Sequence, residues 1–235
     1  MILEVKGINA FYGTSHILFD VSLAVDSGET VCLLGRNGAG KTTTIRGIMG
    51  LTRPRSGNIL FKGEDMRGRP PYYIARKGMG YVPDNRLIFP DLTVRENLEL
   101  AIKVPKDLDG EPWTVQRIYE LFPSLQRLDK NLGGFLSGGE QQMLTVGRTL
   151  MGNPDLLLLD EPVEGLAPMV VKDLGEQILK LKEMGLTILF SEQNIGFAVM
   201  VAERAYIIDN GRIRYQGSIE ELQGNDEIKR KYLMI

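Results

Sequence analysis

A glycine-rich stretch in the first quarter of the chain could bind the phosphates of a nucleotide. Residues 35–42 read GRNGAGKT and fit the pattern G-x-x-x-x-G-K-[ST]. An apolar, partly β-branched run precedes the stretch, and we expect a helix to begin at about Lys41. Glycine lets the backbone wrap closely around an anion, and a helix N-terminus and Lys41 both add positive charge there. The residues of this predicted nucleoside triphosphate site are Gly35, Arg36, Asn37, Gly38, Ala39, Gly40, Lys41, Thr42 and Thr43.

Three oxygen-bearing side chains could complete the chemistry of this site. The Thr42 hydroxyl is a natural ligand for Mg²⁺. Asp160 and Glu161 follow an apolar run that we expect to be a buried strand, and ligands of α/β sheets collect at such strand ends. There Asp160 can hold Mg²⁺, directly or through water, and Glu161 can polarise a water for in-line attack on the γ-phosphate. An Asp-Glu pair alone would more often be a surface pair, so this assignment depends on the phosphate-binding stretch.

The composition argues against several other classes of protein. The chain has 235 residues, with 28 Lys and Arg against 30 Asp and Glu, and nucleic-acid binders usually have a strong basic excess. We therefore expect no nucleic-acid partner. No apolar run approaches the roughly 18 residues of a membrane span, and the N-terminus lacks the pattern of a signal peptide. The single cysteine, Cys32, excludes an internal disulfide, so we expect a cytoplasmic enzyme.

The order of apolar patterns predicts an α/β fold. Roughly alternating polar and apolar residues in 3–6 and 20–26 predict β structure near the N-terminus. Continuous apolar runs with helical stretches between them predict parallel strands that are covered on both faces. These runs are 30–34, 156–159 and 187–190. Asn210-Gly211 predicts a hairpin between two further strands.

A helical region interrupts this α/β pattern. Thr93 and Glu96 form a capping box, residues 115–122 have helical spacing, and residues 104–110 look like a surface loop. We expect a single domain, 1–235, in which a helical lobe, 84–154, is inserted into a core made of 1–83 and 155–235.

One string within this helical region resembles the signature of a known family. Residues 136–142 read LSGGEQQ, as in the ATP-binding cassette (ABC) ATPases, and the resemblance extends over essentially the whole chain. It implies a mainly parallel sheet with an antiparallel β part, and it implies ATP and Mg²⁺ as ligands. It also implies a head-to-tail dimer in which Ser137, Gly138 and Gly139 face the γ-phosphate of the partner's ATP. Tyr12 lies where the family places the aromatic that stacks on adenine; the alternative is an exposed strand tyrosine.

The chain departs from the common family pattern at three positions. Asp84 replaces the glutamine that usually contacts Mg²⁺ and water, so the resemblance makes its carboxylate a metal contact. Gln193 replaces the usual histidine, and Ala167 replaces an aspartate; the only histidine, His16, is an expected bystander. An amide can orient a water but cannot take up a proton near neutrality, so we expect Glu161 to be the base and Gln193 to serve geometry. The alternative is that Gln193 merely ends a strand and points elsewhere.

These departures together resemble the ATPase subunits of branched-chain amino acid importers, above all the shorter of two paired ATPases. The segments that carry the likeness are 84, 88–97, 139–143, 164–168 and 192–194. The resemblance implies an ATPase that powers uptake through separate integral membrane permease subunits, at the inner face of the membrane. It would act as a homodimer or as a heterodimer with a second ABC ATPase. A urea or amide importer and an ABC exporter are alternatives, and a soluble ABC ATPase of translation or DNA repair is an alternative of another class.

Overall fold

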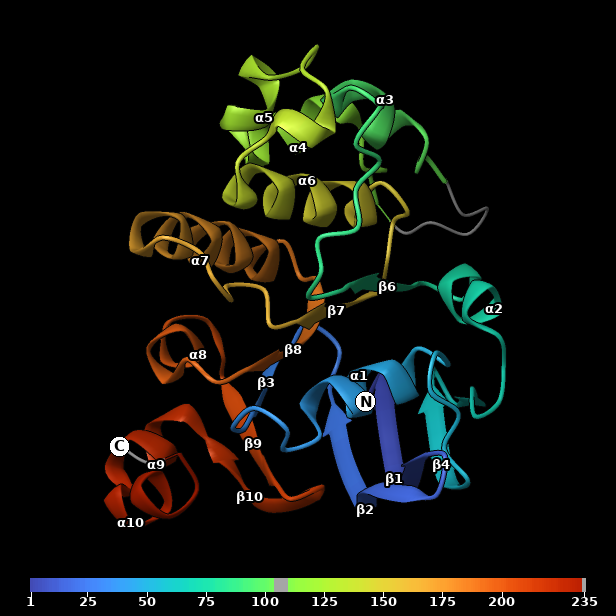
Figure 1. Ribbon diagram of the computed structural model, residues 1–235, viewed down its shortest axis with the longest axis vertical. Helices are drawn as coiled ribbons and strands as arrows, with labels where there is room; N and C mark the ends of the chain where they lie inside the picture. Colours follow the sequence, from blue (N-terminus) through green and yellow to red (C-terminus); the bar gives the residue numbers. More distant parts are fainter. Residues whose placement is uncertain (104–109, 234–235) are drawn as a thin grey trace.

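The computed structural model describes residues 1–103 and 110–233, and its strands form two sheets (Figure 1). The first sheet is antiparallel, with the strand order β2-β1-β4-β5. Its strands are β1 (Leu3–Tyr12), β2 (Ser15–Val25), β4 (Ser56–Phe61) and β5 (Glu64–Asp65). Buried and less buried residues alternate along much of β1, which confirms the β structure expected near the N-terminus.

The second sheet is mainly parallel, with the order β10-β9-β3-β8-β7-β6. Its strands are β3 (Thr30–Leu34), β6 (Met79–Val82), β7 (Leu156–Asp160), β8 (Thr187–Glu192), β9 (Arg204–Asp209) and β10 (Arg212–Ser218). Every residue of β3, β7 and β8 is buried. Successive residues of these strands face two different cores, since Cys32 and Leu157 pack into one while Val31 and Leu156 pack into the other. This two-sided burial explains the unbroken apolar runs and confirms the α/β fold.

The hairpin at Asn210-Gly211 is confirmed. It joins β9 to β10, and these two strands form the antiparallel pair of this sheet. Asn210 and Gly211 have φ of 46° and 71°, which are the positive values that a two-residue hairpin turn of this kind requires.

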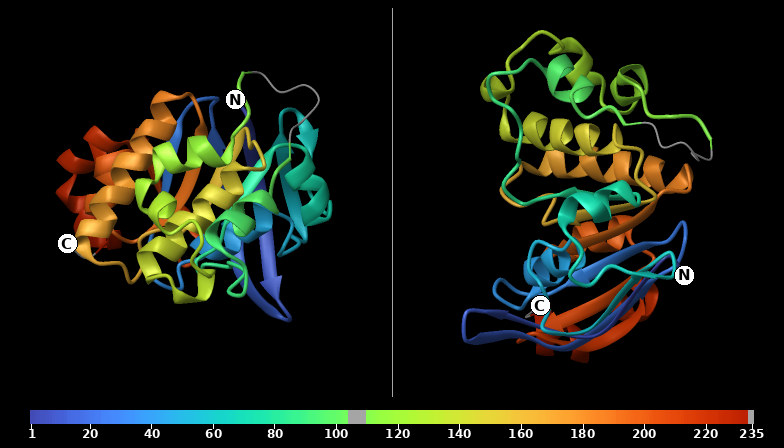
Figure 2. Two further views of the ribbon diagram at one scale, coloured as in Figure 1. Left: turned by 90° about the horizontal axis from the view of Figure 1, so that it is seen from above. Right: turned by 90° about the vertical axis from the view of Figure 1, so that its right-hand side faces the viewer.

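A group of helices connects β6 to β7 and lies at one end of the molecule, opposite the antiparallel sheet (Figures 1 and 2). Its members are α3 (Val94–Glu99), α4 (Val115–Leu121), α5 (Pro123–Arg127), the 3₁₀ turn Gly133–Phe135 and α6 (Gly138–Leu150). The Thr93 capping box that starts α3 is confirmed. The surface loop expected at 104–110 falls almost wholly on residues outside the described part of the chain.

The remaining helices cover the sheet and follow its last strand. They are α1 (Lys41–Ile48), α2 (Pro71–Arg76), α7 (Pro168–Glu183), α8 (Ile195–Val201), α9 (Ile219–Gly224), α10 (Asp226–Ile228) and the π-helical turn Lys229–Leu233. The sequence pattern places the start of this helical stretch at Val170, but α7 begins two residues earlier, at Pro168, because proline suits the first helical position. Among the helices that the structure describes, none has the length and apolarity that crossing a membrane demands.

Candidate functional site

The glycine-rich loop joins the end of β3 to the start of α1. Gly40 precedes α1 with a φ of 113°, and no side chain caps the first turn of this helix. Helices α3, α6 and α9, by contrast, are capped by Thr93, Ser137 and Ser218. The first N–H groups of α1 are therefore free to bind an anion, which fits the triphosphate site predicted for 35–43.

Lys41 brings the loop and the acidic pair together. Its side chain is 2% exposed, and its Nζ donates hydrogen bonds to the carbonyls of Gly35 at 2.8 Å and Arg36 at 3.0 Å. The same ammonium lies 3.1 Å from Oε1 of Glu161. All three ammonium donors thus have partners, and a bound phosphate would compete with these partners for the same charge.

Asp160 lies at the carboxyl end of β7 and is fully buried. Its Oδ1 accepts hydrogen bonds from the hydroxyls of Ser191 at 2.6 Å and Thr42 at 3.1 Å. Burial raises the pKa of Asp160, and the hydrogen bonds from Ser191 and Thr42 oppose this rise. Two of the predicted metal ligands, Thr42 and Asp160, are therefore adjacent.

The oxygen donors at this place suit Mg²⁺ bound together with a nucleotide. Hydroxyl and carboxylate oxygens are the ligands that Mg²⁺ prefers, and phosphate oxygens usually complete its coordination. Within the described residues, no cluster of three or more His, Cys, Asp or Glu side chains could hold a metal ion by itself. Asp84, the remaining predicted metal ligand, is exposed. Its negative charge contributes to raising the pKa of Asp160, so the two carboxylates interact electrostatically.

Glu161 adopts a conformation that is rare for its residue type. Its φ is 46°, and its backbone N–H donates to both the carbonyl and the hydroxyl of Ser191, each at 3.1 Å. A left-handed non-glycine residue of this kind costs about 1–3 kcal/mol and often marks a functional site. The turn directs the Glu161 side chain back toward Lys41.

Gln193 follows β8 directly and shares a cavity of about 390 Å³ with Glu161 and with the segment behind it. The preceding Glu192 is buried and accepts hydrogen bonds from the backbone N–H groups of Val163 at 3.2 Å, Gln193 at 3.0 Å and Asn194 at 3.1 Å. Burial raises the pKa of Glu192, and the three N–H groups oppose that rise. Through these hydrogen bonds Glu192 connects two parts of the chain: the turn in which Gln193 lies and the segment that follows Glu161.

The predicted signature residues lie away from the phosphate loop of their own chain. Ser137 caps α6, and its Oγ accepts from Glu140 N while the Glu140 carboxylate accepts from Ser137 N. Figures 1 and 2 place α6 in the helical group and α1 on the other side of β6 and β7. Tyr12 ends β1 and is half exposed, and His16 stacks on Phe11 at the edge of the same sheet. The roles of Tyr12 and of Ser137 to Gly139 therefore stay predictions.

Comparison with known proteins identifies the family. Residues 18–164 match the family described as "ABC transporter". The chain belongs to this family. It is an ATP-binding cassette, and its enzymatic activity is ATP hydrolysis.

Two curated relatives and one solved structure span nearly all of the cassette. It is 40% identical, over 99% of both chains, to the high-affinity branched-chain amino acid transport ATP-binding protein BraG of Pseudomonas aeruginosa. It is 38% identical to the lipopolysaccharide export system ATP-binding protein LptB of Haemophilus influenzae, over 99% of this chain and 97% of LptB. The dimeric structure of the bacterial ABC transporter cassette MJ0796 superposes with a TM-score of 0.81 at 25% identity, covering 93% of this chain and 99% of that one.

Sequence reasoning missed three residues that organise the cassette's site. Ser191 holds Asp160 and Glu161, Glu192 joins two turns, and Arg86 donates a hydrogen bond to the Glu164 carbonyl at 2.7 Å. The first two could have been found from their place at the carboxyl end of a buried strand, next to Gln193. Arg86 lies in a loop, and no sequence pattern pointed to its partner.

Proposed function

We propose that the cassette powers the uptake of branched-chain amino acids through separate membrane permease subunits. The observation that carries this proposal is its 40% identity, over 99% of both chains, to BraG. The acidic Asp84 and the Glu192-Gln193-Asn194 sequence support the same subgroup. The cassette would then act at the inner face of the cell membrane, where its permease holds it.

In this proposal the phosphate loop and the start of α1 bind ATP. Lys41 pairs with the β- and γ-phosphates, and Tyr12 stacks on the adenine. Thr42, Asp160 and Asp84 would hold Mg²⁺, which when bound neutralises charge on the phosphate oxygens. Binding of the triphosphate gives Lys41 new partners, so the Glu161 carboxylate is released from the ion pair that it makes at 3.1 Å.

Glu161 then serves as the base for hydrolysis. Its carboxylate accepts a proton from the attacking water while Gln193 orients that water through its amide. Both residues line one cavity of about 390 Å³, so the base and the amide face the same space. Glu192 supports this geometry because it fixes the backbone on which Gln193 is placed.

A second subunit completes the site. Ser137, Gly138 and Gly139 would bind the γ-phosphate of ATP held by a partner cassette, because they lie far from their own phosphate loop. The partner is a second copy or another ABC ATPase, and the dimeric MJ0796 structure supports such an assembly. Hydrolysis would separate the two subunits, and the helical lobe, 84–154, would pass this movement to the permease.

An apolar hollow offers a place for the permease. A cavity of about 380 Å³ is lined by Met49, Leu51, Pro71, Ala75 and Ala101, among others. Leu100 and Ile102, on either side of Ala101, are exposed although they are large and apolar. Exposed apolar groups of this kind favour contact with another protein. Leu51→Asp should therefore weaken co-purification with the permease, whereas Met184→Asp, at an exposed apolar side chain elsewhere, should not.

A second candidate function is export, which the 38% identity to LptB favours. Cargo dependence separates the two candidates. The cassette would be co-purified with its membrane subunits, which would be identified and reconstituted in proteoliposomes, with Glu161→Gln as the inactive control. We expect leucine, isoleucine or valine, offered with the matching binding protein, to stimulate ATP hydrolysis. Stimulation by lipopolysaccharide, or by urea or short amides alone, would overturn the proposed cargo.

A further inference from the structure

The segment between Glu161 and α7, residues 162–167, is held by side chains from two sides. On one side the buried Glu192 accepts a hydrogen bond from Val163 N at 3.2 Å. On the other side Arg86 donates from Nη2 to the Glu164 carbonyl at 2.7 Å. The segment also forms internal turns, since Glu164 N bonds to the Glu161 carbonyl at 3.1 Å and Leu166 N to that of Val163 at 3.2 Å. Its position behind Glu161 is therefore set by contacts to the end of β8 and to the loop that carries Arg86.

The same Arg86 guanidinium also lies against the first turn of α6. A Cβ built on Gly138 would come within 2.6 Å of Arg86 Nη1, and one on Gly165 would lie 3.8 Å from Nη2. The neighbouring Gly139 is just as close to α7, because its Cβ would come within 2.6 Å of Val170 Cγ1. Glycine at 138 thus leaves the space in which Arg86 bridges α6 and the segment 162–167.

The placement of Arg86 has two costs that point to a function. Its own φ is 45°, in the left-handed region that side chains disfavour. Its positive charge lies beside the N-terminus of α6, and the N-terminal end of a helix repels cations because it carries a partial positive charge. Among the described residues no carboxylate pairs with it in a salt bridge. The hydrogen bond to Glu164 is thus the contact that fixes the guanidinium.

We infer that Arg86 is a positioning residue which clamps the segment behind Glu161 to the signature turn of α6. The signature turn, Ser137 to Gly139, and the segment 162–167 would then contact a second subunit as one preformed surface. This contact with a second subunit rests on the proposed ATP-bound dimer. Arg86 acts through the Glu164 carbonyl and Gly138. Its position two residues after Asp84 makes the clamp part of the loop that leads from the metal site to the helical group.

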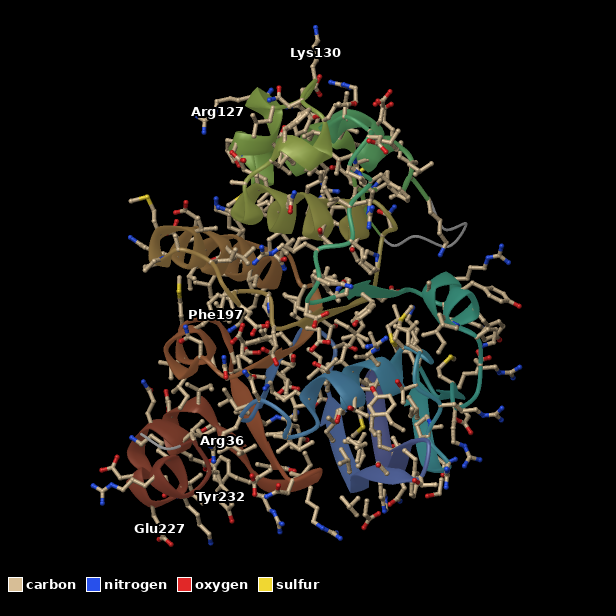
Figure 3. The ribbon with its side chains drawn as sticks, viewed as in Figure 1. Arg36, Arg127, Lys130, Phe197, Glu227 and Tyr232 are labelled. Carbon is tan, nitrogen blue, oxygen red and sulfur yellow. The ribbon has the colours of Figure 1, made fainter. Side chains whose placement is uncertain are left out.

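The clamp is tested first in the monomer, by backbone amide hydrogen exchange without nucleotide. Arg86→Ala should speed exchange at both 163–166 and 138–140, because the two segments lose a shared contact. Arg86→Lys should restore protection at 163–166 alone, since a single ammonium can bind the Glu164 carbonyl but cannot span both segments. The matched control is Arg127→Ala, at an exposed arginine of α5 that points away from the site (Figure 3). Unchanged exchange in Arg86→Ala would overturn the clamp, whether or not the chain forms dimers.

The role of the clamp is tested next by two measurements. Turnover is measured with Glu161 intact, and ATP-dependent dimerisation is measured in the Glu161→Gln background. Arg86→Ala should weaken the dimer and lower kcat by about tenfold each, the effect of losing one hydrogen bond to a charged group. Its monomer should bind ATP as the parent does, because the contacts of the Arg86 side chain are with Glu164 and Gly138 and not with the phosphate loop. Normal turnover despite faster exchange, or an equal loss of monomer ATP affinity, would overturn the positioning role. A Glu161→Gln parent that stays monomeric with ATP would count against the proposed homodimer, while the exchange result still decides the clamp.

Discussion

Lys41 shows at the scale of a residue how the site is prepared for phosphate. Its ammonium is buried, hydrogen-bonded to two loop carbonyls and paired with Glu161. A buried cation needs this many partners because its desolvation is costly. A triphosphate also offers oxygen acceptors to this ammonium, and it carries more negative charge than Glu161. ATP can therefore replace Glu161 as the ionic partner of Lys41.

Replacing Lys41 by alanine should strongly weaken ATP binding while the chain remains folded. Loss of a hydrogen-bonding charge costs roughly 1.5–3 kcal/mol, or about a 10- to 150-fold loss of affinity. Isothermal titration with ATP and circular dichroism would measure the two properties separately. Lys180→Ala, in the last turn of α7, is the control. A folded Lys41→Ala protein that binds ATP normally would contradict the assignment of the phosphate loop.

Gln193→Ala should lower turnover by about tenfold, as expected for a lost hydrogen bond in the reacting complex, and should leave ATP affinity within about twofold. Gln193→His should be tolerated, because imidazole can also donate to a phosphate or a water. The wild-type rate should show no titration near a pKa of about 6.5 that belongs to this position. Steady-state kinetics across pH, on the wild type and on both variants, would measure these effects. Unchanged turnover in Gln193→Ala would leave Glu161 as the only catalytic side chain.

At the scale of elements, the N-termini of helices divide into capped and uncapped ones. Helix α1 has no side-chain cap and meets the phosphate loop, whereas α6 has a full capping box at Ser137. An N-terminus whose N–H groups are satisfied by its own side chain needs no ligand for stability. The two ends therefore differ: the first N–H groups of α1 have no side-chain partner, as a predicted phosphate site requires, whereas those of α6 are capped by its own residues.

Ser137→Asp should separate the capping role of this residue from its proposed role at the dimer interface. Aspartate is as good an N-cap as serine, so the free energy of unfolding should change by less than about 1 kcal/mol. A negative charge facing the partner's γ-phosphate should nevertheless abolish the ATP-dependent dimer. Ser218→Asp makes the same change at the capping box of α9 and should affect neither property. Dimerisation of Ser137→Asp with normal strength would refute the proposed interface.

At the scale of the whole molecule, the two cores on either side of the parallel sheet bury its central strands completely. Cys32, the only cysteine of the chain, is fully buried in β3. Burial raises the pKa of its thiol well above the usual value, and the negative charge of Glu192 adds to this effect. The reactive thiolate is therefore disfavoured in the folded chain.

Cys32 should report global unfolding. A thiol reagent such as Ellman's reagent should react with the native protein at least about a hundredfold more slowly than with the unfolded chain, because β3 must leave the core first. Between pH 7 and 9 the unfolded chain should react faster as its thiol ionises, while the raised pKa keeps the folded thiol protonated. Stopped-flow measurements with and without guanidinium chloride would test this. Fast, stoichiometric reaction under native conditions would show that β3 opens locally.

The sequence by itself determined the features that depend on neighbours in the chain. The loop of glycines before Lys41, the apolar run that leads to Asp160 and the Asn210-Gly211 hairpin follow from backbone freedom and local periodicity. These features were enough to predict the α/β fold and the ATP site. They could not give the start of α7 to the residue, because the ends of a helix depend on small differences in local energy.

Only the tertiary structure decided which distant groups meet. Ser191 on Asp160, Glu192 on Val163 and Arg86 between Glu164 and Gly138 are contacts between segments that are far apart in sequence. Parallel strands bring their carboxyl ends to one edge, so the sheet order sets these encounters, and no local pattern encodes that order. The left-handed turn at Glu161 has the same origin. The strained backbone of Glu161 is stabilised by Ser191 on the neighbouring strand, whose hydroxyl accepts a hydrogen bond from Glu161 N.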